Sequence, residues 1–255
     1  MNILITNDDG YKSVLLKPLI DFFSSAHNVT IVVPKEEQSW RGKSMSRDGH
    51  LQLDEIQLFG KKAWTFSGTP ADCVNVGIHT VCQQKPDLLI AGINGGHNTG
   101  HGFVWSSGTV GASFEANISG VPGIAYSQYL EPETFNVFRS SHTLPEKDYE
   151  RLEKQAEKIL IETWRYCLNK AGFLGSHKTL NINFPWIVNE PLELRDTNIG
   201  TMRYGGVFKK SDQGYSHGLD HSKFHRVEHP QADFIALKDG AVSISCIDLS
   251  VFEAK

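Results

Sequence analysis

The sequence predicts an α/β protein with a mostly parallel sheet, flanking helices and a C-terminal β-rich extension. Short apolar runs alternate with segments that can be helical, and this alternation indicates the βαβ units of a doubly wound sheet. The first apolar run stops at two adjacent carboxylates, Asp8 and Asp9, and in open α/β sheets the functional crevice lies at the carboxyl ends of the strands. With 255 residues, 40% of them hydrophobic, the chain is long enough for one large domain with an extension.

The first half of the chain contains the predicted parallel strands and the helices that connect them. Each strand is a short apolar run, and polar loops separate the strands from the helices. Thr69 followed by Pro70 suits the start of a helix, and Asp72 then lies in the first turn, where the helix dipole favours a structural role for it. The predicted strands are Ile3–Thr6, Val29–Val33, Asp87–Ala91 and Gly123–Tyr126, and the predicted helices are Leu15–Ser24, Pro70–Cys82 and Thr109–Ile118.

The second half begins with the clearest predicted helix, residues 146–170, where apolar residues recur at helical spacing. Leu180–Pro185 is a further strand, which proline stops. Residues 186–232 are rich in polar residues, glycine and histidine, whereas strand character resumes at Phe234–Leu237 and Ala241–Ile247. We therefore expect three parts: a Rossmann-like core over 1–185, an extended arm over 186–232, and C-terminal strands that return to the core over 233–255.

Composition argues against several classes of function. The formal net charge of -4 disfavours binding to nucleic acid polymers or anionic membranes. The four cysteines form no C-x-x-C pair, which favours reduced thiols in a cytosolic protein over a disulfide framework or a zinc site. The N-terminus lacks the basic region of a signal peptide, and no apolar run reaches transmembrane length. These features predict a cytoplasmic protein.

The adjacent carboxylates Asp8 and Asp9 point toward a metal site. No Lys or Arg lies directly beside them in the sequence, and two like charges this close repel one another unless a cation lies between them. Carboxylate oxygens suit hard cations such as Mg²⁺ or Mn²⁺. A surface Asp-Asp-Gly turn accounts for the same residues about equally well, so this segment alone leaves both interpretations open.

Two further segments have the character of phosphate-binding loops. Residues 92–100 contain four glycines, which let the backbone approach a ligand and its amides bind an anion; a flexible connection is the alternative. Ser107-Gly108-Thr109 opens a predicted helix, and a helix N-terminus suits phosphate, although Ser and Thr at this position can equally be simple caps.

In combination, these segments closely resemble the SurE family of survival proteins and 5′-nucleotidases. The resemblance extends over nearly the whole chain and rests on separate motifs in the same order, which makes chance agreement improbable. The matching residues are 5–10 (ITNDDG), 33–34 with 38–39, 68–74 (GTPADCV), 86–88 with 92–96 and 98, 107–112 (SGTVGA), 120–127, 233–234 and 239–244.

The resemblance implies a metal-dependent phosphomonoesterase that hydrolyses nucleoside 5′- and 3′-monophosphates, with one Mg²⁺ or Mn²⁺ ion per subunit. It also implies a homodimer or homotetramer whose subunits contact one another through the arm. We hypothesise that Asp8 assists the reaction as a general base. Full turnover by an Asp8→Asn variant that still binds metal would exclude this role. The implied metal ligands are Asp8, Asp9, Ser39 and Asn94; the implied phosphate-binding residues are Gly95, Gly96, Asn98, Ser107, Gly108 and Thr109; and the implied catalytic residues are Asp8, Asp9, Asn98, Ser107 and Thr109.

Three departures from the usual family pattern lie near the mouth of this predicted site. Residues 13–15 replace a common Ala-Pro-Gly turn, the bulky basic run 40–43 replaces small residues, and Ser106 replaces an aromatic residue. These changes leave the four implied metal ligands in place, but they leave open which nucleobase the site prefers. Trp40 or Trp105 could stack on a nucleobase, although packing is the commoner role of a tryptophan. The alternative functions are a broader phosphatase or exopolyphosphatase, and a non-catalytic nucleotide-binding protein of the same fold.

Histidines recur every four residues in the predicted arm, at His217, His221, His225 and His229. On a helix they would form a stripe able to bind a transition metal, but the neighbouring glycines disfavour a helix, and we expect no metal site there. His97 and His101 flank the glycine-rich loop, either as solvated residues or as phosphate contacts.

Overall fold

A computed structural model describes residues 1–220 and 223–254 of the chain. The strands of its large sheet are β1 (Asn2–Thr6), β2 (Asn28–Pro34), β3 (Leu53–Leu58), β4 (Lys61–Phe66), β5 (Leu88–Gly95), β6 (Gly123–Gln128), β7 (Lys178–Phe184), β8 (Leu194–Thr197) and β13 (Val242–Asp248). The helices are α1 (Leu16–Ser24), α2 (Pro70–Val76), η1 (Gly77–Val81, a π-helix), α3 (Gly100–Ser106), α4 (Gly108–Ile118), α5 (Pro132–Ser141), α6 (Glu146–Asn169), α7 (Asp233–Lys238) and η3 (Leu249–Phe252, a 3₁₀-helix).

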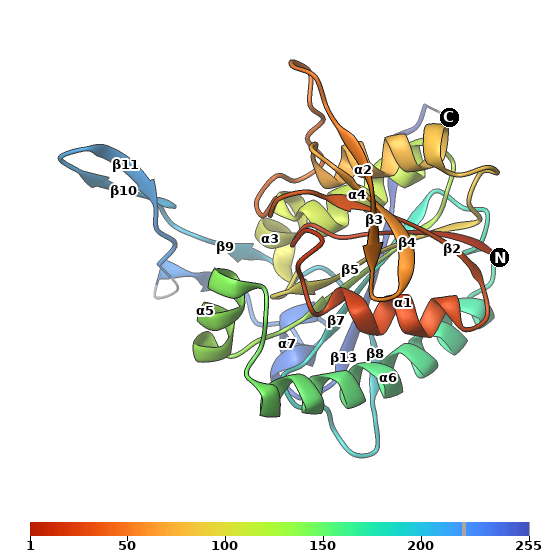
Figure 1. The fold of residues 1–255 in the computed structure, drawn as a ribbon. Coiled ribbons are helices and arrows are strands. Elements are labelled where there is room, and N and C mark those ends of the chain that lie inside the picture. Colours follow the sequence, from red (N-terminus) through yellow and green to blue (C-terminus); the bar gives the residue numbers. More distant parts are fainter. Residues whose placement is uncertain (221–222, 255) are drawn as a thin grey trace.

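The large sheet has the strand order β3-β4-β2-β1-β5-β6-β7-β13-β8 and carries helices on both faces (Figure 1). β3 pairs antiparallel with β4, and β13 pairs antiparallel with β7. The other six neighbouring pairs run parallel. The predicted α/β class, with its mostly parallel sheet and flanking helices, is confirmed.

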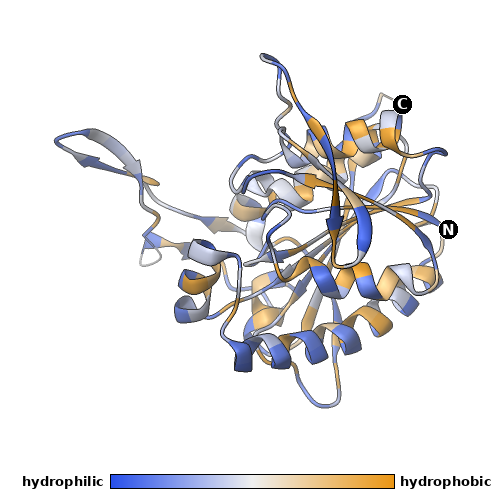
Figure 2. Ribbon diagram, in the orientation of Figure 1, coloured by the Kyte–Doolittle hydropathy of each residue, from blue (hydrophilic) through white to orange (hydrophobic). Residues whose placement is uncertain are grey.

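The two faces of the sheet are buried under different helices. α1 and α6 pack together on one face, where Leu19 and Ile159 join the larger apolar cluster, and α2 and α4 cover the other face. Because both faces are covered, the central strands are continuous apolar runs, and Figure 2 shows the hydrophobic sides of the helices against the sheet. Among residues 1–220 and 223–254, no helix combines the length and apolarity needed to cross a bilayer.

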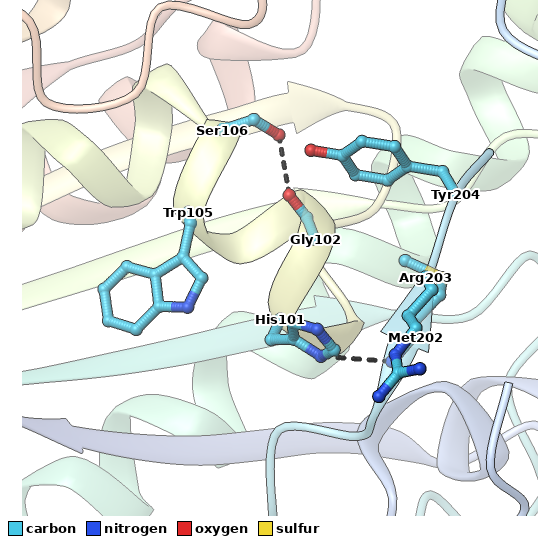
Figure 3. Close-up of a pocket in the computed structure, with 7 residues that line it drawn as sticks. All are labelled: His101, Gly102, Trp105, Ser106, Met202, Arg203 and Tyr204. Atoms are coloured by element: carbon cyan, nitrogen blue, oxygen red, sulfur yellow. Dashed lines mark hydrogen bonds between the residues drawn. The ribbon is translucent and has the colours of Figure 1, made fainter. Parts of the chain in front are cut away.

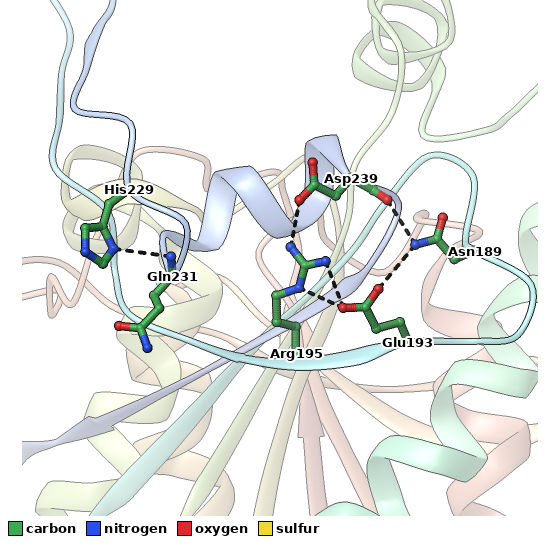
Figure 4. Close-up of polar contacts among 6 residues, drawn as sticks. All are labelled: Asn189, Glu193, Arg195, His229, Gln231 and Asp239. Atoms are coloured by element: carbon green, nitrogen blue, oxygen red, sulfur yellow. Dashed lines mark hydrogen bonds and ion pairs between the residues drawn. The ribbon is translucent and has the colours of Figure 1, made fainter.

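The C-terminal strand β13 lies inside the sheet, between β7 and β8. A polar network fastens the segment that leads into β8 to the end of α7 (Figure 4). Arg195 forms ion pairs with Glu193 at 2.8 Å and with Asp239 at 2.7 Å. The Asn189 side chain donates to the Asp239 carbonyl oxygen at 3.0 Å. These contacts tie residues far apart in the sequence into one edge of the sheet.

Between β8 and α7 the chain forms extended structure outside the large sheet. β9 (Met202–Arg203) pairs antiparallel with β12 (His225–Arg226), and β10 (Phe208–Ser211) pairs with β11 (Gly214–His217) in a hairpin. The hairpin stands away from the rest of the molecule (Figure 1). Its Phe208 and Tyr215 are 64% and 72% exposed, so the hairpin presents apolar rings to its surroundings.

The structure corrects several of the predicted elements. Phe234–Leu237, predicted as a strand, lies in helix α7, because a four-residue apolar run has no periodicity that separates the two states. The predicted helix Pro70–Cys82 divides into α2 and the π-helical turn η1. The predicted structural role of Asp72 in the first turn is confirmed, and the structure adds that its carboxylate accepts the Thr69 N–H at 2.8 Å in a capping box.

Candidate functional site

The strand order places a topological switch point between β1 and β5. From β1 the chain builds the sheet outward through β2 on one side, and it later returns to add β5, β6 and β7 on the other. Ligands of open α/β sheets bind at such points, beyond the carboxyl ends of the strands. Asp8 and Asp9 directly follow β1, and Asn94 and Gly95 end the neighbouring β5. Predicted site residues from two distant segments therefore meet at this edge.

Asp8 and Asp9 are buried, with exposed fractions of 3% and 5%. Thr109 donates its hydroxyl to Asp8 Oδ1 and its backbone N–H to Asp8 Oδ2, and the Gly95 N–H donates to Asp9 Oδ2 at 2.9 Å. Neither carboxylate forms an ion pair with a Lys, Arg or His in the part of the chain that the structure describes. Two buried carboxylates thus lack a positive partner among residues 1–220 and 223–254.

Burial makes ionisation of these two carboxyl groups unfavourable. It raises the pKa of Asp8 from 3.8 to about 6, and the hydrogen bonds from Thr109 offset only part of that shift. Burial, followed by the charge of Asp8, raises the pKa of Asp9 well above its usual value. The negative charge of Glu37 contributes to both shifts. A bound cation would reverse this balance, because it favours the ionised forms.

The other two predicted metal ligands are chain neighbours of residues that form hydrogen bonds to Asp8 and Asp9. The N–H of Gln38, the residue before Ser39, donates to the Asp8 carbonyl oxygen at 2.8 Å, and Asn94 precedes the Gly95 N–H that contacts Asp9. The described residues contain no group of three or more His, Cys, Asp or Glu side chains arranged to hold a metal. An ion here would therefore need neutral donors as well as the two carboxylates, and the hydroxyl of Ser39 and amide of Asn94 fit a hard cation.

Several main-chain N–H groups of the glycine-rich loop already donate hydrogen bonds to acceptors within the protein. Gly95 donates to Asp9, Gly96 donates to the Gln128 carbonyl oxygen at 2.9 Å, and Asn98 donates to Asn183 Oδ1 at 2.7 Å. A phosphate bound by the Gly95 or Gly96 N–H groups would compete with these bonds. The second hydrogen of the Asn98 side-chain amide remains, because among the described residues Asn98 Nδ2 donates to Ser127 Oγ alone, at 2.7 Å.

The N-terminus of α4 reaches the carboxylates directly. Ser107 is the N-cap, and its Oγ accepts the Val110 N–H at 3.1 Å, which leaves its hydroxyl hydrogen available to donate. A Cβ at Gly108 would lie 2.8 Å from Asp8 Cβ, so only glycine allows this helix to approach so closely. The capping interpretation of Ser107 is confirmed, and α4 also presents its positive end at the predicted phosphate position.

The basic loop that departs from the family pattern has a structural partner. Lys43 Nζ lies 2.6 Å from Glu115 Oε2, and the Asn75 side chain donates to Glu115 Oε1 at 2.9 Å. The Gly42 N–H donates to the Ser106 carbonyl oxygen at 2.9 Å. Glu115 is buried, so Lys43 neutralises a carboxylate on α4 and helps to hold the Ser39 loop against that helix.

An aromatic cluster borders the site on the side of the arm. The ring of Trp40, which follows Ser39, lies 5.7 Å from Phe103, 5.6 Å from Tyr204 and 5.0 Å from His217. Phe103 in turn lies 5.1 Å from His97 in the glycine-rich loop. The backbone of Trp40 has φ 62°, a left-handed conformation that bulky residues rarely adopt. Ring contacts across three segments hold it there.

A cavity of about 530 Å³ adjoins this cluster, between α3 and β9 (Figure 3). Within it the Met202 N–H donates to His101 Nδ1 at 3.1 Å, and the Ser106 hydroxyl donates to the Gly102 carbonyl oxygen at 2.9 Å. His101 therefore binds the arm. The lining residues are His101, Gly102, Trp105, Ser106, Met202, Arg203 and Tyr204.

The described arm histidines, His217, His225 and His229, do not share a helix. His217 lies in β11 and His225 in β12, whereas His229 Nδ1 accepts the Gln231 N–H at 3.2 Å (Figure 4). His221 lies outside the described residues.

Sequence reasoning missed the buried polar residues that hold the glycine-rich loop. Asn181 and Asn183 of β7 contact Asn98. The fully buried Asp233 accepts the N–H groups of Gly100 at 2.8 Å and Gly200 at 3.0 Å. A visible signal was the alternation in β7, where asparagines occupy every second position of a predicted buried strand. Their partners lie more than eighty positions away, so the sequence could not name them.

Comparison with known proteins agrees with the motifs and the fold. The family model of survival protein SurE matches residues 3–206. A protein of Aliarcobacter butzleri named 5′-nucleotidase SurE is 34% identical over 98% of this chain and 94% of its own length, and one of Thermoanaerobacter pseudethanolicus with the same name is 30% identical over 99% and 94%. The crystal structure of the SurE protein from Aquifex aeolicus superimposes with a TM-score of 0.72 at 26% identity, covering 98% of this chain and 94% of that one.

Proposed function

This chain belongs to the SurE family, and from that premise we propose that it is a metal-dependent phosphomonoesterase that hydrolyses nucleoside 5′- and 3′-monophosphates. The names of its relatives support the nucleotidase activity. One structural observation carries the proposal furthest: the buried carboxylates Asp8 and Asp9 lack a cationic partner among the described residues at the switch point of the sheet, where Asp8 contacts the N-terminus of α4.

The residues at this edge have complementary roles in the proposed reaction. Asp8, Asp9, Ser39 and Asn94 would hold one divalent ion, Mg²⁺ or Mn²⁺, which would supply charge neutralisation and Lewis acidity for the phosphoryl group. Thr109 orients both oxygens of Asp8. The Asn98 amide and the Ser107 hydroxyl are the side-chain donors left to contact the phosphate oxygens, and the positive end of α4 favours the same anion.

The aromatic cluster supports a nucleotide over a simple sugar phosphate. Trp40 is 37% exposed, so part of its indole ring is available to a nucleobase. Because Trp40 directly follows a proposed metal ligand, a phosphate bound at the metal would place the attached nucleoside beside this ring.

We also propose that the subunits assemble into a homodimer or homotetramer through the arm. The exposed apolar rings of the β10–β11 hairpin support this, since rings presented to water on a projecting hairpin gain stability when a second subunit covers them.

The decisive experiment measures phosphate release from nucleoside 5′- and 3′-monophosphates with Mg²⁺, Mn²⁺ or EDTA. We expect metal-dependent release by the wild type, and a loss of at least about a thousandfold in the Asp8→Asn/Asp9→Asn variant, because that variant removes the metal-binding charge. Release from polyphosphate or sugar phosphates at equal rates would favour the broader phosphatase. Nucleotide binding without release from any ester by the folded protein would favour the non-catalytic alternative.

A further inference from the structure

Asn98 of the glycine-rich loop is held by hydrogen bonds to both its backbone and its side chain. Its N–H donates to Asn183 Oδ1 at 2.7 Å, and its carbonyl oxygen accepts the Asn181 side chain at 2.7 Å. Its own amide donates to Ser127 Oγ at 2.7 Å. Backbone donor, backbone acceptor and side chain are thus fixed by three separate residues, which leaves Asn98 little freedom to rotate or shift.

The three partners are core residues of adjacent strands. Ser127 lies on β6, and Asn181 and Asn183 lie on β7, all with 0% exposure. The neighbours of the asparagines in the strand, Leu180, Ile182 and Phe184, belong to the apolar cluster on the opposite face of the sheet. Because side chains alternate along a strand, one face of β7 builds the core while the other presents two amides toward the loop.

We infer that Asn181 and Asn183 are positioning residues for phosphoryl transfer, and that they act by fixing Asn98 against the substrate phosphate. This inference rests on the proposed function, since it assumes that Asn98 contacts the phosphate. Phosphoryl transfer depends mainly on positioning and electrostatic stabilisation, so a donor that loses its fixed position reduces turnover even where the fold survives.

The chemistry of the pair favours this role over simple stabilisation. Buried amides contribute to stability only when all their groups are satisfied, yet Asn181 Oδ1 is buried and accepts no hydrogen bond from the described residues. An apolar residue would fill the same position without an unpaired acceptor. The pair is accounted for by its bonds to Asn98.

The test compares Asn183→Leu with a matched control, Asn117→Leu. Asn117 is also a buried asparagine, and it donates to the carbonyl oxygens of Val121 at 3.0 Å and Lys178 at 3.1 Å, outside the loop. For each variant we would measure kcat and KM for a nucleoside monophosphate, the Kd for Mn²⁺ by calorimetry, and Tm. We expect both to lower Tm, but only Asn183→Leu to lower kcat, by about tenfold or more, with the Mn²⁺ Kd within about twofold of wild type.

Two further variants separate positioning from folding. Asn183→Asp keeps the acceptor for the Asn98 N–H but loses the amide that donates to the Asn98 carbonyl oxygen at 3.4 Å, so it should recover part of the kcat that Asn183→Leu loses. In an Asn98→Ala background, Asn183→Leu should produce no further fall in kcat, because the group that it positions is already absent.

The outcomes are distinct. An unchanged kcat in Asn183→Leu, an equal fall in Asn117→Leu, or a full further fall in the Asn98→Ala background would overturn the inference while leaving the proposed function standing. A folded wild type that releases no phosphate from any ester would overturn the proposed function, and the inference with it.

Discussion

The buried carboxylates of Asp8 and Asp9 lower the stability of the metal-free protein when they are ionised, and the ionised form is the one that binds a cation. Their raised pKa values mean that the folded state holds protons that the unfolded state releases, over a window that begins near 3.8 and extends to about 6 for Asp8. Stability of the metal-free protein should therefore fall as pH rises through that window. Metal binding needs the ionised carboxylates, so its stabilising effect should grow over the same range.

Asp9→Asn should raise the stability of the metal-free protein at pH 7.5, because burial and the charge of Asp8 raise the pKa of Asp9 and so make its ionised form unfavourable in the folded state. At pH 4 the variant and the wild type should unfold alike. Thermal unfolding in EDTA at both pH values, repeated with Mn²⁺, checks this, and Mn²⁺ should raise the Tm of the wild type but not that of Asp9→Asn. Asp87→Asn, at the opposite end of β5, is the control that should keep the Mn²⁺ response. A metal-free Asp9→Asn less stable than wild type at pH 7.5 would contradict the account.

The loop from Ser39 to Ser44 shows how far sequence reasoning extends. The family resemblance implied that this loop lies near Asp8, and it marked Trp40 as unusual. The ring partners of Trp40 are Phe103, Tyr204 and His217, which come from segments that no local pattern links to it. Strands with continuous apolar runs, such as β1 and β5, were predictable because burial on both faces dictates them. The β3–β4 hairpin at the sheet edge was not, since β3 is mostly exposed and neither strand carries such a run.

Trp40→Ala should raise the KM for AMP by about five- to tenfold, the amount expected for one lost base-stacking contact. The KM for ribose 5-phosphate should change by less than about twofold, because that substrate has no base to stack. Steady-state phosphate release with both substrates measures this. Trp105→Ala, which removes the other candidate ring, should alter neither value, and the reverse pattern would assign the base to the cavity between α3 and β9.

The subunit assembly that we propose is a property of the whole molecule, and we expect it to depend on the arm. The β10–β11 hairpin of the arm is exposed, whereas β9 packs on α3 and Tyr204 contacts the Trp40 ring. The arm therefore contacts the site at one end and is exposed at the other. Apolar rings on a projecting hairpin are typical of a surface that another subunit covers.

Phe208→Ser/Tyr215→Ser should reduce the oligomer to a smaller species, because it removes the two most exposed rings of the hairpin. Light scattering after size exclusion measures the mass. Ile118→Ser removes a side chain that is also 65% exposed but lies on α4, and it should leave the mass unchanged. An unaltered mass in the hairpin variant would place the subunit contact elsewhere.

The location of β13 bears on how the protein is made. The ribosome synthesises β8 before β13, yet β13 separates β8 from β7 in the finished sheet, so β8 has no strand to pair with until the last strand emerges. Asp233, which binds Gly100 of the early glycine-rich loop, is also synthesised late. A nascent chain therefore carries Asp8 and Asp9 long before the groups that fix the loop beside them have been translated. We therefore expect the nascent chain to hydrolyse no substrate until translation is complete, rather than to gain activity gradually as it is synthesised.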